Sequence, residues 1–124
     1  MPRTPTVVLT RQPEDNAPLR ALLEARGLGV IEAPCVAAAT IEPPEAETRR
    51  LPPLGALAAA AFASRRGVEG FFAWLAAHPE RDAGRPALIG AVGPATAKAL
   101  AARGWPADVV AEPATGEALA RALV

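Results

Sequence analysis

The chain has 124 residues, enough for one ordinary domain but too few for two well-filled hydrophobic cores. Its thirteen basic and thirteen acidic side chains cancel, so no net charge favours nucleic acid or an acidic membrane surface, and we expect neither partner. A single cysteine, Cys35, excludes an internal disulfide, and with the single histidine, His78, it leaves too few ligands for a recognisable metal site.

The apolar segments of this chain are shorter than a membrane span, and no long apolar segment follows the first residues as in a signal peptide. We therefore expect a cytoplasmic protein. Cys35 has no histidine in its own predicted element, so we expect a small buried thiol rather than a nucleophile.

The first elements in chain order form a β-α-β unit over residues 1–36. Residues 6–10, TVVLT, have the β-branched composition of a short buried strand, and residues 28–36, LGVIEAPCV, form the next strand. A helix over residues 19–27 lies between them and ends at Gly27, a residue suited to the left-handed backbone that stops a helix. So short a crossover predicts two parallel strands.

The start of this first helix carries capping residues and a proline. Asp15 or Asn16 is predicted to cap the helix, with Pro18 in the first turn, where a missing N–H costs little. Leu19, Leu22 and Leu23 share one helical face, so we expect them to pack inward.

Residues 37–53, AAATIEPPEAETRRLPP, differ in composition from the segments on both sides. They contain four prolines and show no hydrophobic periodicity. Proline stiffens a chain that forms no regular element, so this segment is predicted to be a stiff linker or an extended crossing.

Residues 54–124 resume the alternation, in the order β-α-β-α-β-α. Gly104 is predicted to end a helix here as Gly27 does earlier, although any two α-β units would show this similarity. Thr115 is the expected cap of the last helix. The strands are predicted at residues 57–64, 87–93 and 107–113, and the helices at residues 65–78, 94–104 and 115–124. In the first of these helices, the side chains predicted to face inward are Val68, Phe71, Phe72 and Leu75.

This order of elements predicts an α/β fold, an open parallel sheet of about five strands with helices on both faces. Two arrangements of the chain remain open. In one, residues 1–36 fold back onto residues 54–124 of the same chain. In the other, two chains exchange these units across the linker and form a homodimer.

Ligands of such sheets bind at the carboxyl ends of the strands. Here those ends carry hydroxyls, arginines, small residues and helix starts, where free N–H groups and the helix dipole favour phosphate or carboxylate. The alternative is that the hydroxyls are only helix caps and that Gly93-Pro94 is only a turn. The candidate substrate-binding residues are Thr10, Arg11, Ser64, Arg65, Arg66, Gly93, Pro94, Ala95, Thr96 and Thr115.

Three short motifs in register carry a resemblance to a known family. One strand ends in Thr10-Arg11, another ends at Ser64 with Val68 in the following turn, and a third ends at Gly93 with Thr96-Ala97 behind it. In these motifs and their order the chain resembles the N-terminal half of the uroporphyrinogen-III synthase family, and the similarity covers nearly all of its length.

The resemblance implies an enzyme of tetrapyrrole biosynthesis that needs no cofactor. Such an enzyme takes linear hydroxymethylbilane, expels its hydroxyl as water, inverts the terminal pyrrole and closes the macrocycle. The substrate carboxylates would be held at the edge described above, and no catalytic residue is identified. The chain has no tyrosine, so a tyrosine often proposed as proton donor in the family's second half has no counterpart. The alternative function is a non-catalytic tetrapyrrole- or carboxylate-binding module derived from half of such an enzyme.

Overall fold

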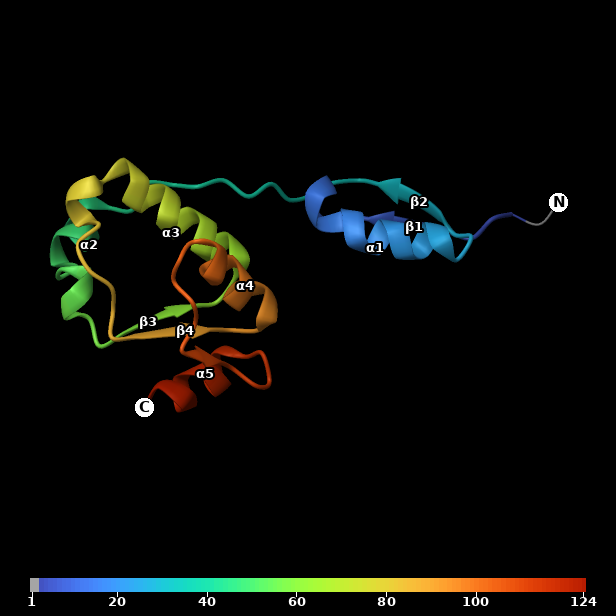
Figure 1. Cartoon of the computed structure of the whole chain (residues 1–124). Helices are drawn as coiled ribbons and strands as arrows, with labels where there is room; N and C mark the ends of the chain where they lie inside the picture. The colour runs from blue at the N-terminus through green and yellow to red at the C-terminus, as the bar shows by residue number, and fades with distance from the viewer. Residues whose placement is uncertain (1–2) are drawn as a thin grey trace. The chain divides into compact units, whose positions relative to one another are not determined.

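The computed structural model describes residues 3–124, and the chain divides into two compact units, residues 1–40 and residues 41–124 (Figure 1). Parallel strands alternate with helices, as predicted. The prediction of one sheet of about five strands is wrong, because the strands form a two-stranded sheet and a separate three-stranded sheet. The prediction failed because the order of strands and helices along a sequence does not determine which strands pair with one another in a sheet.

The first unit is one β-α-β motif. Strand β1 (Thr6–Leu9) and strand β2 (Gly29–Glu32) are parallel and in full register, and helix α1 (Pro13–Ala25) connects them. The Arg20 guanidinium joins helix to sheet, since it lies 2.9 Å from Glu24 and 3.0 Å from Glu32. Its hydrogen bond to Glu24 and the charges of both carboxylates raise the pKa of Arg20 above its ordinary value.

Helix α1 begins earlier than the sequence predicts. Gln12 occupies the cap position and Pro13 opens the helix, so neither Asp15 nor Asn16 is the N-cap. Asn16 is buried instead, and its side-chain amide donates to the carbonyl oxygen of Arg11 at 2.7 Å. Pro18 consequently lies inside the helix, beyond the first turn. A proline is favoured at the first helical position, so Pro13 rather than a polar cap marks the start of this helix.

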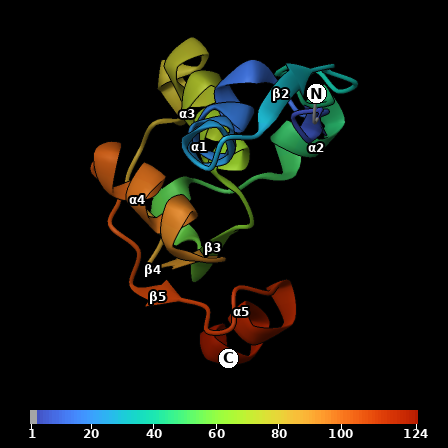
Figure 2. The same cartoon turned by 90° about the vertical axis from the view of Figure 1, so that its right-hand side faces the viewer.

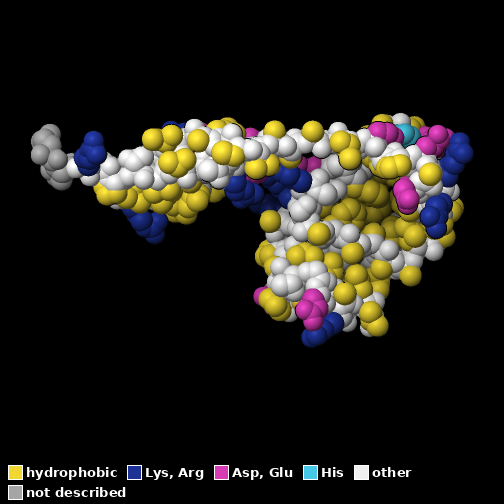
Figure 3. All heavy atoms as spheres, turned by 180° about the vertical axis from the view of Figure 1, so that it is seen from behind, with side chains coloured by type: hydrophobic (Ala, Val, Ile, Leu, Met, Phe, Trp, Pro, Cys, Tyr) yellow, Lys and Arg dark blue, Asp and Glu magenta, His cyan; other side chains and the backbone are white. Residues whose placement is uncertain are grey.

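The expected inward face of α1 is largely wrong. Leu19 and Leu22 are 48% and 55% exposed, while Leu23 is half-buried. The other face of the sheet is exposed too, since Val8 and Ile31 pair across the strands and are each 54% exposed. Figure 3 shows apolar side chains over the surface of this unit. One helix on two strands cannot cover this much apolar surface.

Cys35 is exposed, and its thiol lies 3.2 Å from the carbonyl oxygen of Ala33. The prediction of a buried thiol is therefore wrong. Strand β2 ends at Glu32, so Cys35 lies beyond it.

Part of the predicted linker is helical. Helix α2 (Glu45–Arg50) has two glutamates in its first turn and two arginines in its last, the order that complements a helix dipole. A short 3-10 helix, η1 (Leu54–Ala56), follows it. Leu54 is 2% exposed and packs with Trp74 and Leu75, so the residue directly after the predicted linker belongs to the core of the second unit.

The second unit contains a three-stranded parallel sheet in the order β3-β4-β5. Its strands are shorter than predicted, but each lies within its predicted range. After η1, the elements are β3 (Ala59–Phe62), α3 (Arg65–Ala77), η2 (Pro79–Arg81), β4 (Leu88–Ala91), α4 (Pro94–Ala102), β5 (Val109–Val110) and α5 (Gly116–Leu123).

Helices cover both faces of this sheet, as predicted (Figure 2). On one face, Ile89 of β4 packs with side chains of α3 and α4, including Val68 and Leu100, and all three are fully buried. On the other face, a Cβ at Gly90 would lie 2.8 Å from Leu119 of α5, so the glycine permits the close approach of that helix. The four side chains expected to face inward from α3 all contribute to the core, with Val68 and Leu75 buried and Phe71 and Phe72 half-buried.

Candidate functional site

The candidate residues of the second unit come together at one edge of its sheet. Because β3, β4 and β5 are parallel, their carboxyl ends point the same way. Ser64, Gly93 and Thr115 follow these strands and are the cap residues of α3, α4 and α5. The edge therefore carries three helix N-termini, whose free N–H groups and dipoles favour an anion.

Two of the hydroxyls at this edge act as helix caps. Ser64 Oγ accepts a hydrogen bond from the backbone N–H of Gly67 at 3.0 Å, and Thr115 Oγ1 accepts from that of Ala118 at 3.1 Å. A hydroxyl that accepts one hydrogen bond still has its own proton to donate. Both side chains are exposed, so that proton is available to a ligand carboxylate.

Gly93 has a backbone conformation that other residues rarely adopt. Its φ is 84° and its ψ is 165°, and a Cβ there would lie 3.2 Å from the Cβ of Ala114. Pro94 then occupies the first position of α4, where the missing N–H costs no helical hydrogen bond. The turn leaves the N–H groups of Ala95 and Thr96 at the start of the helix, where no preceding turn provides acceptors.

The Thr96 hydroxyl differs from the two capping hydroxyls. The side chain is 3% exposed, yet its oxygen forms no hydrogen bond with any of residues 3–124. The Thr96 oxygen is also not among the fully enclosed atoms without a partner, so it keeps contact with solvent. This hydroxyl is free to donate to a ligand that reaches the start of α4.

Arg65 and Arg66 open helix α3. Their position at a helix N-terminus is slightly unfavourable for cations, but both have partners, including Glu69, whose carboxylate lies 3.7 Å from Arg65 Nε. The i,i+4 pair with Glu69 lies on the exposed surface and contributes little to stability. About half of the Arg65 side chain is exposed at the start of α3.

Thr10 and Arg11 occupy the equivalent place in the first unit, after β1. The Thr10 carbonyl accepts a hydrogen bond from the N–H of Cys35 at 2.9 Å. Arg11 Nη2 lies 3.9 Å from Asp15, and its side chain is 73% exposed. Each unit thus has candidate residues at the carboxyl edge of its own sheet.

The arrangement in the second unit can bind carboxylates but has no evident acid–base pair. Its groups are backbone N–H donors, hydroxyls and guanidiniums, all of which donate hydrogen bonds to anions. Among residues 3–124, no three His, Cys, Asp or Glu side chains are grouped as a metal site would require. Over the same residues, no helix has the length and apolar character needed to cross a membrane.

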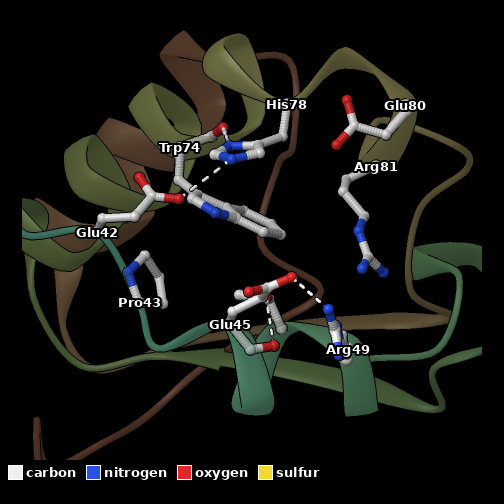
Figure 4. Close-up of a pocket in the computed structure, with 9 residues that line it drawn as sticks. Glu42, Pro43, Glu45, Arg49, Trp74, His78, Glu80 and Arg81 are labelled. Carbon is white, nitrogen blue, oxygen red and sulfur yellow. Dashed lines mark hydrogen bonds and ion pairs between the residues drawn. The ribbon is translucent and has the colours of Figure 1, made fainter.

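Sequence reasoning predicts no site at the far end of α3, where the structure has a cavity. Its walls include Glu42, Trp74, His78 and Arg81, which come from three separate segments (Figure 4). The one sequence pattern that could have indicated this cavity is the pair Trp74 and His78, which are one helical turn apart at the end of an amphipathic helix. Such spacing is more often a packing pattern than a site, so the sequence alone gave no reason to select it.

Comparison with known proteins adds a family assignment to this geometry. The sequence profile of Uroporphyrinogen-III synthase HemD matches residues 17–124, well over half of the chain. No curated protein matches it. The matched region contains the whole second unit with the candidate residues at its carboxyl edge, together with most of α1 and all of β2. The chain belongs to the uroporphyrinogen-III synthase family.

Proposed function

We propose that this chain acts in tetrapyrrole biosynthesis, in the cytoplasm, and converts hydroxymethylbilane to uroporphyrinogen III. The observation that carries the proposal is the family match over residues 17–124. The edge at the carboxyl ends of β3, β4 and β5 supports it, because its donors suit a substrate that carries many carboxylates.

The reaction is a dehydration without oxidation or reduction. The terminal carbon–oxygen bond breaks as pyrrole electrons displace the hydroxyl, which takes up a proton and leaves as water. The electrophilic carbon left behind bonds to the substituted α carbon of the terminal pyrrole, and the bond from that α carbon to its original bridge carbon breaks. The released bridge carbon then bonds to the other, unsubstituted α carbon, which loses its proton, so the macrocycle closes with the terminal pyrrole inverted. Because the substrate itself drives loss of the hydroxyl, the protein needs mainly to hold the ends of the chain so that the correct carbon is attacked.

The edge of the second unit would supply this positioning. The Thr96 hydroxyl and the N–H groups at the start of α4 would bind one acetate or propionate of the substrate. The hydroxyl protons of Ser64 and Thr115 would bind others, and Arg65 and Arg66 would add charge. No cofactor is required by this chemistry.

A non-catalytic binding module is the second candidate function. The observation that favours it is the character of the edge, where every candidate residue except Pro94 has a hydrogen-bond donor and none is paired as a general acid with a general base. Such a module would bind a tetrapyrrole through its carboxylates and release it unchanged.

Isomer analysis separates the two functions. Freshly prepared hydroxymethylbilane is incubated with the chain, with heat-denatured chain and with buffer, and the uroporphyrinogen isomers are resolved. A type III product above both controls is the expected result for the enzyme. Only the spontaneously formed type I product would rule out catalysis by this chain alone, and retained uroporphyrinogen binding would then favour the binding module.

We also propose that two chains form a homodimer by exchanging units across residues 37–53. The exposed apolar side chains of the first unit, among them Val8, Leu22 and Ile31, support this arrangement because they lack cover within their own unit. Size-exclusion chromatography with light scattering tests it. The expected mass is twice that of the chain, and a monomer at high protein concentration would contradict the exchange.

A further inference from the structure

A cavity of about 510 Å³ lies at the end of the second unit opposite the candidate carboxylate edge. Its walls come from α2, from the end of α3 and from η2 (Figure 4). Helix α3 starts at the carboxyl edge of the sheet, and its tenth residue, Trp74, is the first of the helix to line the cavity. At 1.5 Å per residue the two places are roughly 14 Å apart, so the cavity is not part of the edge described above.

Trp74 forms one wall of this cavity and has an unused hydrogen-bond donor. The residue is 9% exposed, and its indole Nε1 is fully enclosed without a partner. An enclosed donor without an acceptor costs free energy, and native proteins seldom leave one. Because this nitrogen is enclosed, the exposed part of Trp74 that lines the cavity belongs to other atoms of the residue.

Arg81 supplies a second donor with spare capacity. It is half-buried, and one of its terminal nitrogens donates to the carbonyl oxygen of Leu51 at 3.3 Å. Within residues 3–124 no carboxylate lies within salt-bridge distance of its guanidinium. The planar guanidinium therefore keeps N–H groups that fit a carboxylate in two-point fashion.

Two of the three carboxylates around the cavity already have cationic or polar partners. Glu42 lies 3.1 Å from His78 Nε2, and Glu45 lies 2.6 Å from Arg49. The third, Glu80, is on the exposed surface of η2, where solvent screens its charge. Arg81 is consequently the half-buried cation around the cavity that has no carboxylate partner, and it favours an anion.

The wall beside these groups is flat and aromatic. The indole ring of Trp74 lies 5.2 Å from the imidazole of His78 between ring centroids, with 32° between the planes. Figure 4 shows Pro43 near the same end of the indole as Glu42, and Arg81 beyond the opposite end of the ring. A planar ring against the indole would place a substituent toward the guanidinium.

From this arrangement we propose that the cavity binds a small planar carboxylate. The ring of the ligand packs against Trp74, and its carboxylate pairs with Arg81. This site does not depend on the proposed catalytic function, and either can fail without the other.

The first experiment titrates the chain with benzoate and with benzamide, its neutral counterpart, up to about 10 mM, where even a Kd near 1 mM approaches saturation. The indole N–H resonances of Trp74 and Trp105 are followed by two-dimensional ¹⁵N NMR, with Trp105→Phe used for assignment. We expect a saturable shift of the Trp74 resonance with benzoate only. Trp105 packs against Phe71 and Phe72 instead and should barely move. Absence of a saturable shift, or equal binding of both compounds, overturns the proposal.

The second experiment compares Arg81→Gln with Arg121→Gln. Loss of the guanidinium should weaken benzoate binding about tenfold or more, because a charge-assisted pair is lost. Arg121 is exposed on α5, paired with Glu117, and lies outside the cavity, so its substitution should leave the affinity unchanged. Equal affinity in Arg81→Gln and the parent chain overturns the site. If Arg81→Gln fails to fold, the comparison of benzoate with benzamide on the parent chain still decides.

Discussion

The two units of this chain are built from the same motif and differ in how well it is covered. In the second unit, helices lie on both faces of the sheet, and Val68, Ile89 and Leu100 are fully buried. In the first unit, one helix lies on two strands. Of the hydrophobic residues described in this unit, only Leu9 is buried. The difference shows that strands and helices can form from local signals, whereas burial depends on how many neighbours an element has.

Local signals are indeed equivalent in the two units. Gly27 and Gly104 both have a φ of 77° directly after the end of a helix, as predicted from the sequence. Both helices are entered through a proline at the first helical position, Pro13 in α1 and Pro94 in α4. Equivalent starts and stops therefore produce one well-packed unit and one open unit.

The largest effect should come from separating the units. Residues 41–124 expressed alone are expected to unfold cooperatively on heating, because their core lies within the segment. Residues 1–40 alone should not fold, since a segment of about 40 residues without disulfides or metals seldom buries enough apolar surface. Circular dichroism melting curves of the two fragments test this. A cooperative transition in the isolated first unit would show that its exposed surface needs no partner.

Leucine-to-alanine substitutions sharpen the same comparison. Leu100→Ala, in the core of the second unit, should cost about 2–5 kcal/mol in the free energy of unfolding, as deletions at fully buried leucines do. Leu22→Ala, at a position 55% exposed within a single chain, should stay within about 0.5 kcal/mol in the dilute monomer and cost more in the proposed exchanged dimer, where the side chain would be covered. Urea unfolding by circular dichroism reports the whole chain, and fluorescence reports the second unit, which contains both tryptophans. A large cost at Leu22 would indicate that the side chain is buried in solution, as in an exchanged dimer.

These contrasts explain what could be predicted from the sequence. The positions of strands and most helices follow from short apolar runs, glycine stops and capping residues, and the caps at Ser64 and Thr115 follow the same rules. The inward face of α3 was correct because four apolar side chains recur at helical spacing. The inward face of α1 was wrong because the same spacing says nothing about whether a neighbour is present.

The candidate site divides in a similar way. Parallel topology alone brings Ser64, Gly93 and Thr115 to one edge, so their grouping could be predicted without side-chain detail. The free hydroxyl of Thr96 could not, because it depends on which acceptors surround it after folding. The cavity at Trp74 depends on segments that are distant in sequence, and no local sequence pattern predicts that these segments come together.

Glycine substitutions provide an intermediate effect. Gly93→Ala should destabilise the chain by about 1–3 kcal/mol, because the new side chain meets Ala114 and the backbone conformation is almost restricted to glycine. Gly27→Ala should cost only about 1 kcal/mol, since its φ is also positive but no atom lies within 4 Å of the added Cβ. Thermal melting of both variants checks the order. Equal costs would mean that the contact with Ala114 relaxes freely.

The smallest effect on stability, with the largest consequence for function, is expected at Thr96. Its hydroxyl has no hydrogen bond within residues 3–124, so Thr96→Val removes no internal interaction, and the melting temperature should hardly change. Binding of uroporphyrinogen should weaken about tenfold or more, since a hydrogen bond to a charged carboxylate is lost.

Ser64→Ala is the matched control for that variant. It removes a hydroxyl that caps α3 through the N–H of Gly67, so it should lower stability by about 1 kcal/mol in addition to any loss of binding. Calorimetric titration of uroporphyrinogen under anaerobic conditions, beside a melting curve for each variant, separates the two roles. An unchanged affinity in Thr96→Val together with a lower melting temperature would mean that Gly93 to Thr96 form only a turn, and that the carboxylate must be held by other groups of this edge.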